Sequence, residues 1–122
     1  MLRDDVADHV HHHGPMFAVA VDRVDFWTET LKCGRQVGQR PETRADELVQ
    51  HLDWTTPEGR VLLSEERREK AHPGLVTLLT WRSRLRVRDG VKLTGSHYFG
   101  LGMRFAAGMD KIGAFRNSAN AP

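Results

Sequence analysis

Hydrophobic and polar residues alternate most regularly between residues 75 and 88. The largely apolar set of alternate positions comprises Leu75, Thr77, Leu79, Trp81, Ser83, Leu85 and Val87. The intervening set ends in arginines, which are Arg82, Arg84, Arg86 and Arg88. A period of two is typical of a strand, whereas a helix would scatter the arginines around its surface. The pattern therefore predicts a long strand with an arginine face. Asp89-Gly90 is typical of a tight turn, so we expect residues 91–93 to return as the next strand.

A second alternation covers residues 47–54. It places Leu48, Leu52 and Trp54 on one face and Val49, His51 and Asp53 on the other. The turn-forming sequence Thr-Pro-Glu-Gly follows at residues 56–59, and Val-Leu-Leu opens a returning strand at residue 61. Residues 65–70 are good helix formers, but they continue this returning strand and have no apolar stripe. We therefore predict a β-hairpin that ends in charged residues.

Shorter patterns complete the predicted fold. The apolar run at residues 16–21 suits a buried strand, and residues 35–37 suit a short strand between turns. The glycine-rich segment 95–105 suits a late strand with bulges or close backbone approaches. These features predict a mainly β fold, an antiparallel β-sandwich in which several strands lack evident partners. We divide the chain into a lead-in at residues 1–8, a partial sandwich domain at residues 9–108 and a polar tail at residues 109–122.

Composition narrows the classes of function. The 122 residues are 39% hydrophobic and 28% charged, which suits a single globular domain. The formal net charge is only +2, so the composition predicts neither a nucleic-acid partner nor a membrane-surface partner. No apolar run approaches the roughly 20 residues of a membrane-spanning helix. Cys33 is the single cysteine and excludes an internal disulfide, so a reducing, cytoplasmic location is expected.

The most distinctive motif is the histidine-rich stretch at residues 8–14, Asp-His-Val-His-His-His-Gly. In a strand, His9 and His11 share a face and predict a divalent metal site for zinc, copper or iron, with Asp8 as an oxygen ligand. A second interpretation is that the imidazoles hydrogen-bond to sugar hydroxyls, and that His11 or His12 acts as a general acid or base. A third is a structural or solvent-exposed run without a ligand.

Other candidate residues lie later in the chain. Trp54, beside the predicted turn, is the tryptophan best placed to stack on a ligand, whereas Trp81 belongs to an apolar face and is expected in the core. His97 and Arg104 lie on the glycine-rich strand, and Arg104 offers either ligand contacts or a surface ion pair. The arginine face predicts an anionic groove or a solvated strand face.

The order of these motifs resembles a bacterial family of unknown function that carries the label methane oxygenase PmoA. The matching segments are residues 8–14, 24–27, 34–37, 54–59, 79–81 and 99–104. Many members of that family have arginine where His13 stands. Members are longer than this chain, so the resemblance implies a fragment. Their sandwich is similar to galactose-mutarotase-like folds, which bind sugars on a concave sheet.

These observations support one leading hypothesis and two alternatives. The leading hypothesis is binding or processing of a carbohydrate or related polyhydroxyl molecule by His9, His11 and His12, with Trp54, His97 and Arg104 in support. One alternative is a metal-dependent oxygenase, as the label of the family suggests. The other is a non-catalytic remnant that self-associates through open sheet edges. Whether the chain is an enzyme is left open.

Overall fold

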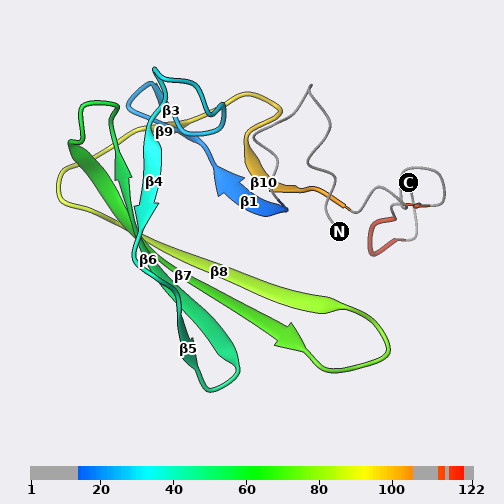
Figure 1. The fold of residues 1–122 in the computed structure, drawn as a ribbon. Helices are drawn as coiled ribbons and strands as arrows, with labels where there is room; N and C mark the ends of the chain where they lie inside the picture. The colour runs from blue at the N-terminus through cyan, green and yellow to red at the C-terminus, as the bar shows by residue number, and fades with distance from the viewer. Residues whose placement is uncertain (1–13, 106–112, 115, 120–122) are drawn as a thin grey trace.

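The computed structural model describes residues 14–105, 113–114 and 116–119 (Figure 1). Among these residues the regular secondary structure consists of β-strands alone, and the sheets are antiparallel. This confirms the predicted mainly β class. The strands are β1 (Pro15–Ala18), β2 (Ala20–Val21), β3 (Val24–Asp25), β4 (Arg35–Gly38), β5 (Glu42–Arg44), β6 (Glu47–Thr55), β7 (Val61–His72), β8 (Leu78–Val87), β9 (Leu93–Thr94) and β10 (Gly100–Met103).

The largest sheet has the order β4-β6-β7-β8, and β5 pairs with the same edge of β6 as β4 does. The hairpin of β6 and β7 is confirmed, with Trp54 opposite Leu63 and Glu47 opposite Lys70. The predicted strand through residues 65–70 is confirmed as well, since β7 continues to His72. It is an inner strand between β6 and β8, because β8 pairs along its other edge.

The arginine-bearing strand is also confirmed, although β8 begins at Leu78, three residues after the predicted start. Arg82, Arg84 and Arg86 are exposed, while the intervening Trp81 and Leu85 are partly buried. The alternation of apolar and polar residues thus correctly predicted both the strand and the direction of its side chains.

The predicted hairpin after Asp89-Gly90 is wrong. The chain does not fold back on β8, and β9 pairs with β2 instead. Asp22 explains this path, because its backbone N–H donates to the Lys92 carbonyl at 3.0 Å and its carboxylate accepts from the Lys92 N–H at 2.9 Å. Two hydrogen bonds to a distant segment outweigh the local preference for a tight turn.

The core lies where the smaller sheets pack against one end of the large sheet. Trp54, Leu52 and Leu63 contribute from β6 and β7, and Val21 and Phe26 contribute from the β2–β3 region. The Trp54 ring lies 4.9 Å from the Phe26 ring, centroid to centroid. Burial of these side chains stabilises the fold through the apolar surface removed from water.

Two smaller sheets, β1-β10 and β3-β2-β9, cover this end of the large sheet, and the arrangement is sandwich-like (Figure 1). The far ends of β7 and β8 project beyond them (Figure 1). Leu78 and Leu79 there are exposed, as are Leu75 and Val76 in the connecting loop. Within the described part of the chain, the cluster of buried core residues therefore lies at one end of the large sheet, and Val49 of β6 is buried outside this cluster. None of the described elements is a helix long and apolar enough to cross a membrane.

We expect Leu63→Ala to lower the free energy of unfolding by about 2–5 kcal/mol, because it leaves a cavity among buried side chains. Leu63 is 2% exposed, whereas Leu75 is fully exposed, at 108%. Leu75→Ala is therefore the matched control and should leave the free energy unchanged. Urea unfolding of both variants measures the difference, and equal effects would contradict this location of the core.

Gly102 provides a second test, because β10 passes close to two side chains. A Cβ atom at Gly102 would lie 2.9 Å from Cη2 of Trp27 and 3.3 Å from Cγ of Met16. Gly102→Val should therefore destabilise the fold by about 1–3 kcal/mol through overpacking. Gly90 has no atom within 4 Å of such a Cβ, so Gly90→Val is the control. Thermal melting should separate the two variants, with only Gly102→Val lowering Tm.

Candidate functional site

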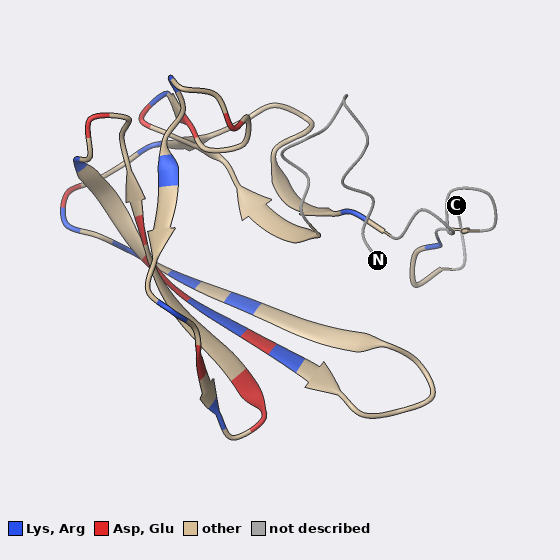
Figure 2. Cartoon of the chain, viewed as in Figure 1, with Lys and Arg blue, Asp and Glu red and all other residues tan. Residues whose placement is uncertain are grey.

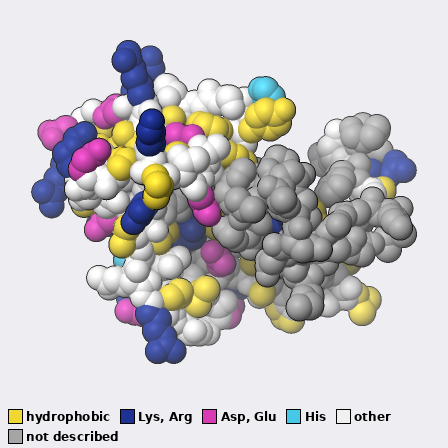
Figure 3. Space-filling model, turned by 45° about the horizontal axis from the view of Figure 1, so that its top comes forward, with side chains coloured by type: hydrophobic (Ala, Val, Ile, Leu, Met, Phe, Trp, Pro, Cys, Tyr) yellow, Lys and Arg dark blue, Asp and Glu magenta, His cyan; other side chains and the backbone are white. Residues whose placement is uncertain are grey.

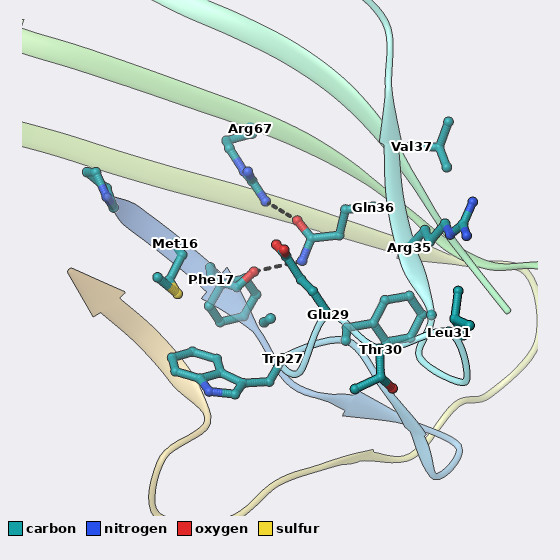
Figure 4. Close-up of a pocket in the computed structure, with 14 residues that line it drawn as sticks. Met16, Phe17, Trp27, Glu29, Thr30, Leu31, Arg35, Gln36, Val37 and Arg67 are labelled. Atoms are coloured by element: carbon teal, nitrogen blue, oxygen red, sulfur yellow. Dashed lines mark hydrogen bonds between the residues drawn. The ribbon is translucent and has the colours of Figure 1, made fainter. Parts of the chain in front are cut away.

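A cavity of about 820 Å³ lies between β1, β4 and the loop that joins β3 to β4. Its volume falls within the range of roughly 300–1,000 Å³ that is common for small-molecule sites. β1 contributes Met16 and Phe17, the loop contributes Trp27 and Glu29, and β4 contributes Gln36. Arg67 reaches it from β7, which belongs to the same sheet as β4. Figure 4 shows these side chains around the cavity.

The loop at residues 26–34 is held closed by Asp25 and Gly34. The Asp25 carboxylate accepts a hydrogen bond from the Trp27 N–H at 2.7 Å, and Thr28 donates to it through both its N–H and its hydroxyl. The Gly34 N–H donates to the Asp25 carbonyl at 2.8 Å. A side chain at position 34 would collide with the Phe26 ring, since a Cβ would lie 2.4 Å from Cε1. Glycine at this position therefore permits the closure that brings Trp27 and Glu29 to the cavity.

A chain of hydrogen bonds fixes the polar wall. Arg67 Nη2 donates to Gln36 Oε1 at 2.8 Å, and Gln36 Nε2 donates to the Phe17 carbonyl at 2.8 Å (Figure 4). Figure 4 shows Gln36 pointing toward β1, whereas Arg35 and Val37 lie on the other side of β4. This alternation follows from the period of the strand. The wall thus presents an amide and a guanidinium in fixed orientations.

Arg67 is fixed in position by the buried carboxylate of Glu65. Its Nε donates to Glu65 Oε1 and its Nη2 to Glu65 Oε2, both at 2.9 Å. Glu65 also accepts from the Trp54 indole N–H at 2.9 Å and from the Ser83 hydroxyl at 2.6 Å. The Arg67 guanidinium lies over the Trp81 ring, 4.7 Å from its centroid. These contacts leave the guanidinium little freedom, because both its edge and its face are engaged.

The rest of the wall is aromatic and apolar. Trp27 is partly buried, and its ring stacks on Phe99 with centroids 5.9 Å apart. Phe17 packs against the core through Trp54, with centroids 6.0 Å apart. The carboxylate of Glu29 points toward Phe17 and Gln36 (Figure 4). An aromatic surface beside a few oriented polar groups suits a small molecule that has both C–H faces and hydroxyl groups.

The predicted histidine site lies outside the described residues. This applies to Asp8, His9, His11 and His12, and so to the predicted metal site and acid–base pair. In the part of the chain that the structure describes, no group of three His, Cys, Asp or Glu side chains is placed to hold a metal ion. Cys33 is buried, and its thiol lies 3.0 Å from the Thr30 hydroxyl and 3.3 Å from the Thr28 hydroxyl.

Trp54 does not fit its predicted role as a stacking surface. Its side chain is 0% exposed, because the smaller sheets pack over this end of β6, and its indole N–H donates to Glu65. His97 and Arg104 do not line the cavity. The His97 ring lies against Tyr98 with centroids 3.9 Å apart, and the Arg104 N–H donates to the Gly14 carbonyl at 3.1 Å.

The cavity residues Trp27, Gln36 and Arg67 were not predicted from the sequence. Gln36 is an ordinary polar residue of a short strand, and Arg67 lies within a run of charged residues that reads as a solvated strand. Trp27 carried a weak signal, since a tryptophan next to a turn is a common part of a ligand site, but core packing is the commoner role. Only the tertiary arrangement of β4, β7 and the loop between β3 and β4 brings the three together.

Comparison with known proteins identifies the family of this chain but no activity. Searches of curated proteins and of solved structures gave no match. A family model described as "Family of unknown function (DUF6807)" matches residues 1–122, which is the whole sequence. The chain therefore belongs to this family of unknown function, DUF6807.

Proposed function

We propose that the protein binds a small carbohydrate or related polyhydroxyl molecule in the cavity between β1, β4 and the loop at residues 26–34. The observation that carries the proposal is the pairing of an aromatic surface with fixed polar groups around one cavity. Trp27 supplies the aromatic surface, and Gln36 and Arg67 supply the polar groups. Sugars present C–H faces to aromatic rings and hydroxyl groups to planar amides, guanidinium groups and carboxylates.

The hydrogen-bonding capacity of the wall favours hydroxyl groups. Arg67 Nη1 makes no hydrogen bond with a described residue and has two N–H donors to offer. The side-chain carbonyl of Gln36 provides an acceptor, since it accepts one hydrogen bond from Arg67 and has a second lone pair. A hydroxyl group both donates and accepts, so neighbouring hydroxyls on one molecule match a wall that alternates donors and acceptors.

The rigidity of the wall supports affinity. The Arg67 side chain is 12% exposed and the Glu65 side chain is 0% exposed, so the pair is shielded from solvent. Side chains that are already ordered lose little conformational entropy when a ligand binds. The charge of Arg67 is balanced by Glu65, which favours a neutral polar ligand over a strongly anionic one.

We also propose that the histidine motif contacts this ligand. His9, His11 and His12 precede β1 in the sequence, and β1 supplies Met16 and Phe17 to the cavity. Imidazoles that titrate near neutral pH are suited to hydrogen bonding with hydroxyls and to moving a proton. His11 and His12 are the proposed acid–base residues if the ligand is chemically converted.

We expect Trp27→Ala to raise the Kd for the ligand by about tenfold or more, which corresponds to about 1.4 kcal/mol of lost contact. Trp27→Phe, which keeps a smaller ring, should fall between this variant and the wild type. Tyr98→Ala is the control, because Tyr98 is an exposed aromatic residue that does not line the cavity. Isothermal titration calorimetry with a panel of neutral mono- and disaccharides provides the measurement. Wild-type affinity in Trp27→Ala, or no binding by any sugar in the panel, would contradict the proposal.

Replacing both His11 and His12 by alanine should abolish sugar binding without changing the urea midpoint. His72→Ala is the control, because His72 lies at the end of β7 and bonds to Thr80. Calorimetry on both variants tests the assignment. Binding that survives the double substitution would remove the histidines from the site while leaving the cavity itself in place.

A further inference from the structure

The face of the large sheet that points away from the core carries a charged array on its three long strands. Across the sheet, aligned residues form three rows. The rows are Val49–Arg68–Arg82, His51–Glu66–Arg84 and Asp53–Ser64–Arg86. With histidine neutral, this array contains four arginines and two acidic residues and so has a net charge of +2. It is separate from the cavity, which opens on the other face of the sheet.

The acidic residues of this array already have partners within it. Glu66 accepts a hydrogen bond from Arg68 Nε at 3.0 Å, which lowers the pKa of Glu66 and keeps it charged. Asp53 accepts from the Ser64 hydroxyl at 2.6 Å. Arg68 also forms an ion pair with Glu47 at 3.3 Å. The hydrogen bonds and ion pairs of these acidic residues are therefore made within β6 and β7, while Arg84, opposite Glu66, adds a weaker electrostatic contribution that also lowers the pKa of Glu66.

The arginines of β8 are different. Arg82, Arg84 and Arg86 are exposed, and none of them forms an ion pair with a described residue. Figure 2 shows the positive segments along β8, a strand that has no acidic residue. β8 is also an edge strand, since β7 is its one partner among the described elements. Its outer edge therefore offers backbone donors and acceptors next to a row of exposed arginines that form no ion pair with a described residue.

We propose that β8 binds an extended acidic segment of a partner protein, which adds to the sheet as its next strand. Acidic side chains at alternate positions of that segment would lie opposite Arg82, Arg84 and Arg86. The intervening positions would lie beside Trp81, Ser83 and Leu85 and would be apolar or small. Addition of a strand to an open edge combines backbone hydrogen bonds with side-chain selection at alternate positions.

The spacing of the charges favours a polypeptide strand. Arginines two residues apart on a strand repeat at about 6.6–6.8 Å, which is also the repeat of alternate side chains on a paired strand. Three carboxylates can therefore face three guanidinium groups without distortion. Single-stranded nucleic acid is less suited to this face, because its nine positions include no Phe, Tyr or Trp on which bases would stack.

Charge also disfavours a second copy of this chain at the same edge. Antiparallel pairing of β8 with itself about a two-fold axis places side chains of the same face opposite one another. With the axis at Arg84, Arg84 would face the partner's Arg84 and Arg82 would face the partner's Arg86. With the axis at Ser83, Arg82 would face the partner's Arg84. Like charges directly opposite one another destabilise a strand pair. An acidic strand has the opposite effect at each of these positions.

The test uses the full chain and a fluorescent peptide of about nine residues, the length of a long strand, with blocked ends. Glutamate alternates with valine and threonine in this peptide, and fluorescence anisotropy measures its binding. The proposal predicts saturable binding that weakens as salt is raised. A peptide of the same composition with its glutamates in one block should bind more weakly, as should one with a central proline, which cannot donate to the ladder.

Two protein variants locate the contact. Arg82→Gln/Arg84→Gln should weaken binding by about tenfold, because two cross-strand charge pairs are lost. Arg35→Gln/Arg40→Gln removes the same charge from the opposite edge of the sheet, at β4 and the β4–β5 connection, and should bind as the wild type does. Equal weakening in both variants, equal binding of the blocked-glutamate and proline peptides, or no binding at all would overturn the proposal. A wild-type dimer on gel filtration that the peptide does not dissociate would assign this edge to a second copy and would also overturn it.

Discussion

The buried carboxylate of Glu65 is the constraint on which the described structure depends. A charged group without exposure is strongly unfavourable unless it is hydrogen-bonded and paired. Here four donor groups from Trp54, Arg67 and Ser83 reach its two oxygens. They come from β6, β7 and β8, so one side chain ties together the three long strands at the point where the core begins.

The same carboxylate links the core to the cavity. Because Arg67 is held by Glu65 and stacked on Trp81, it can orient Gln36, and Gln36 in turn bonds to the backbone of β1. The cavity wall is therefore an extension of the hydrogen-bond network of the sheet and not a set of independent surface residues. On the opposite face, the alternation of the strands leaves the β8 arginines outside any such network, which explains why one sheet presents a neutral polar cavity on one side and a cationic edge on the other.

The sequence patterns predicted individual strands and the direction of their side chains, but they did not predict how segments far apart in the chain pair. The period-two patterns identified β6, β7 and β8 and the outward direction of Arg82, Arg84 and Arg86, because strand geometry fixes these features within a few residues. The pairing of β9 with β2 and of β10 with β1 depends on segments far apart in the chain, so a local turn signal at Asp89-Gly90 was misleading. The burial of Glu65 was equally hidden, since a glutamate followed by charged residues resembles a solvated strand. Trp54 was predicted to stack on a ligand because the sequence did not reveal Phe26, from a distant segment, as its packing partner in the core.

The most direct test of this account is a double-mutant cycle on Glu65 and Arg67, measured by urea unfolding of the wild type, Glu65→Gln, Arg67→Met and the double variant. If the buried pair acts as described, each single substitution leaves a polar group without its partner, and the double variant loses less than the sum of the two. The predicted coupling free energy is about 1–3 kcal/mol. Additive losses, with a coupling free energy near zero, would show that Glu65 does not hold Arg67 in the wall of the cavity.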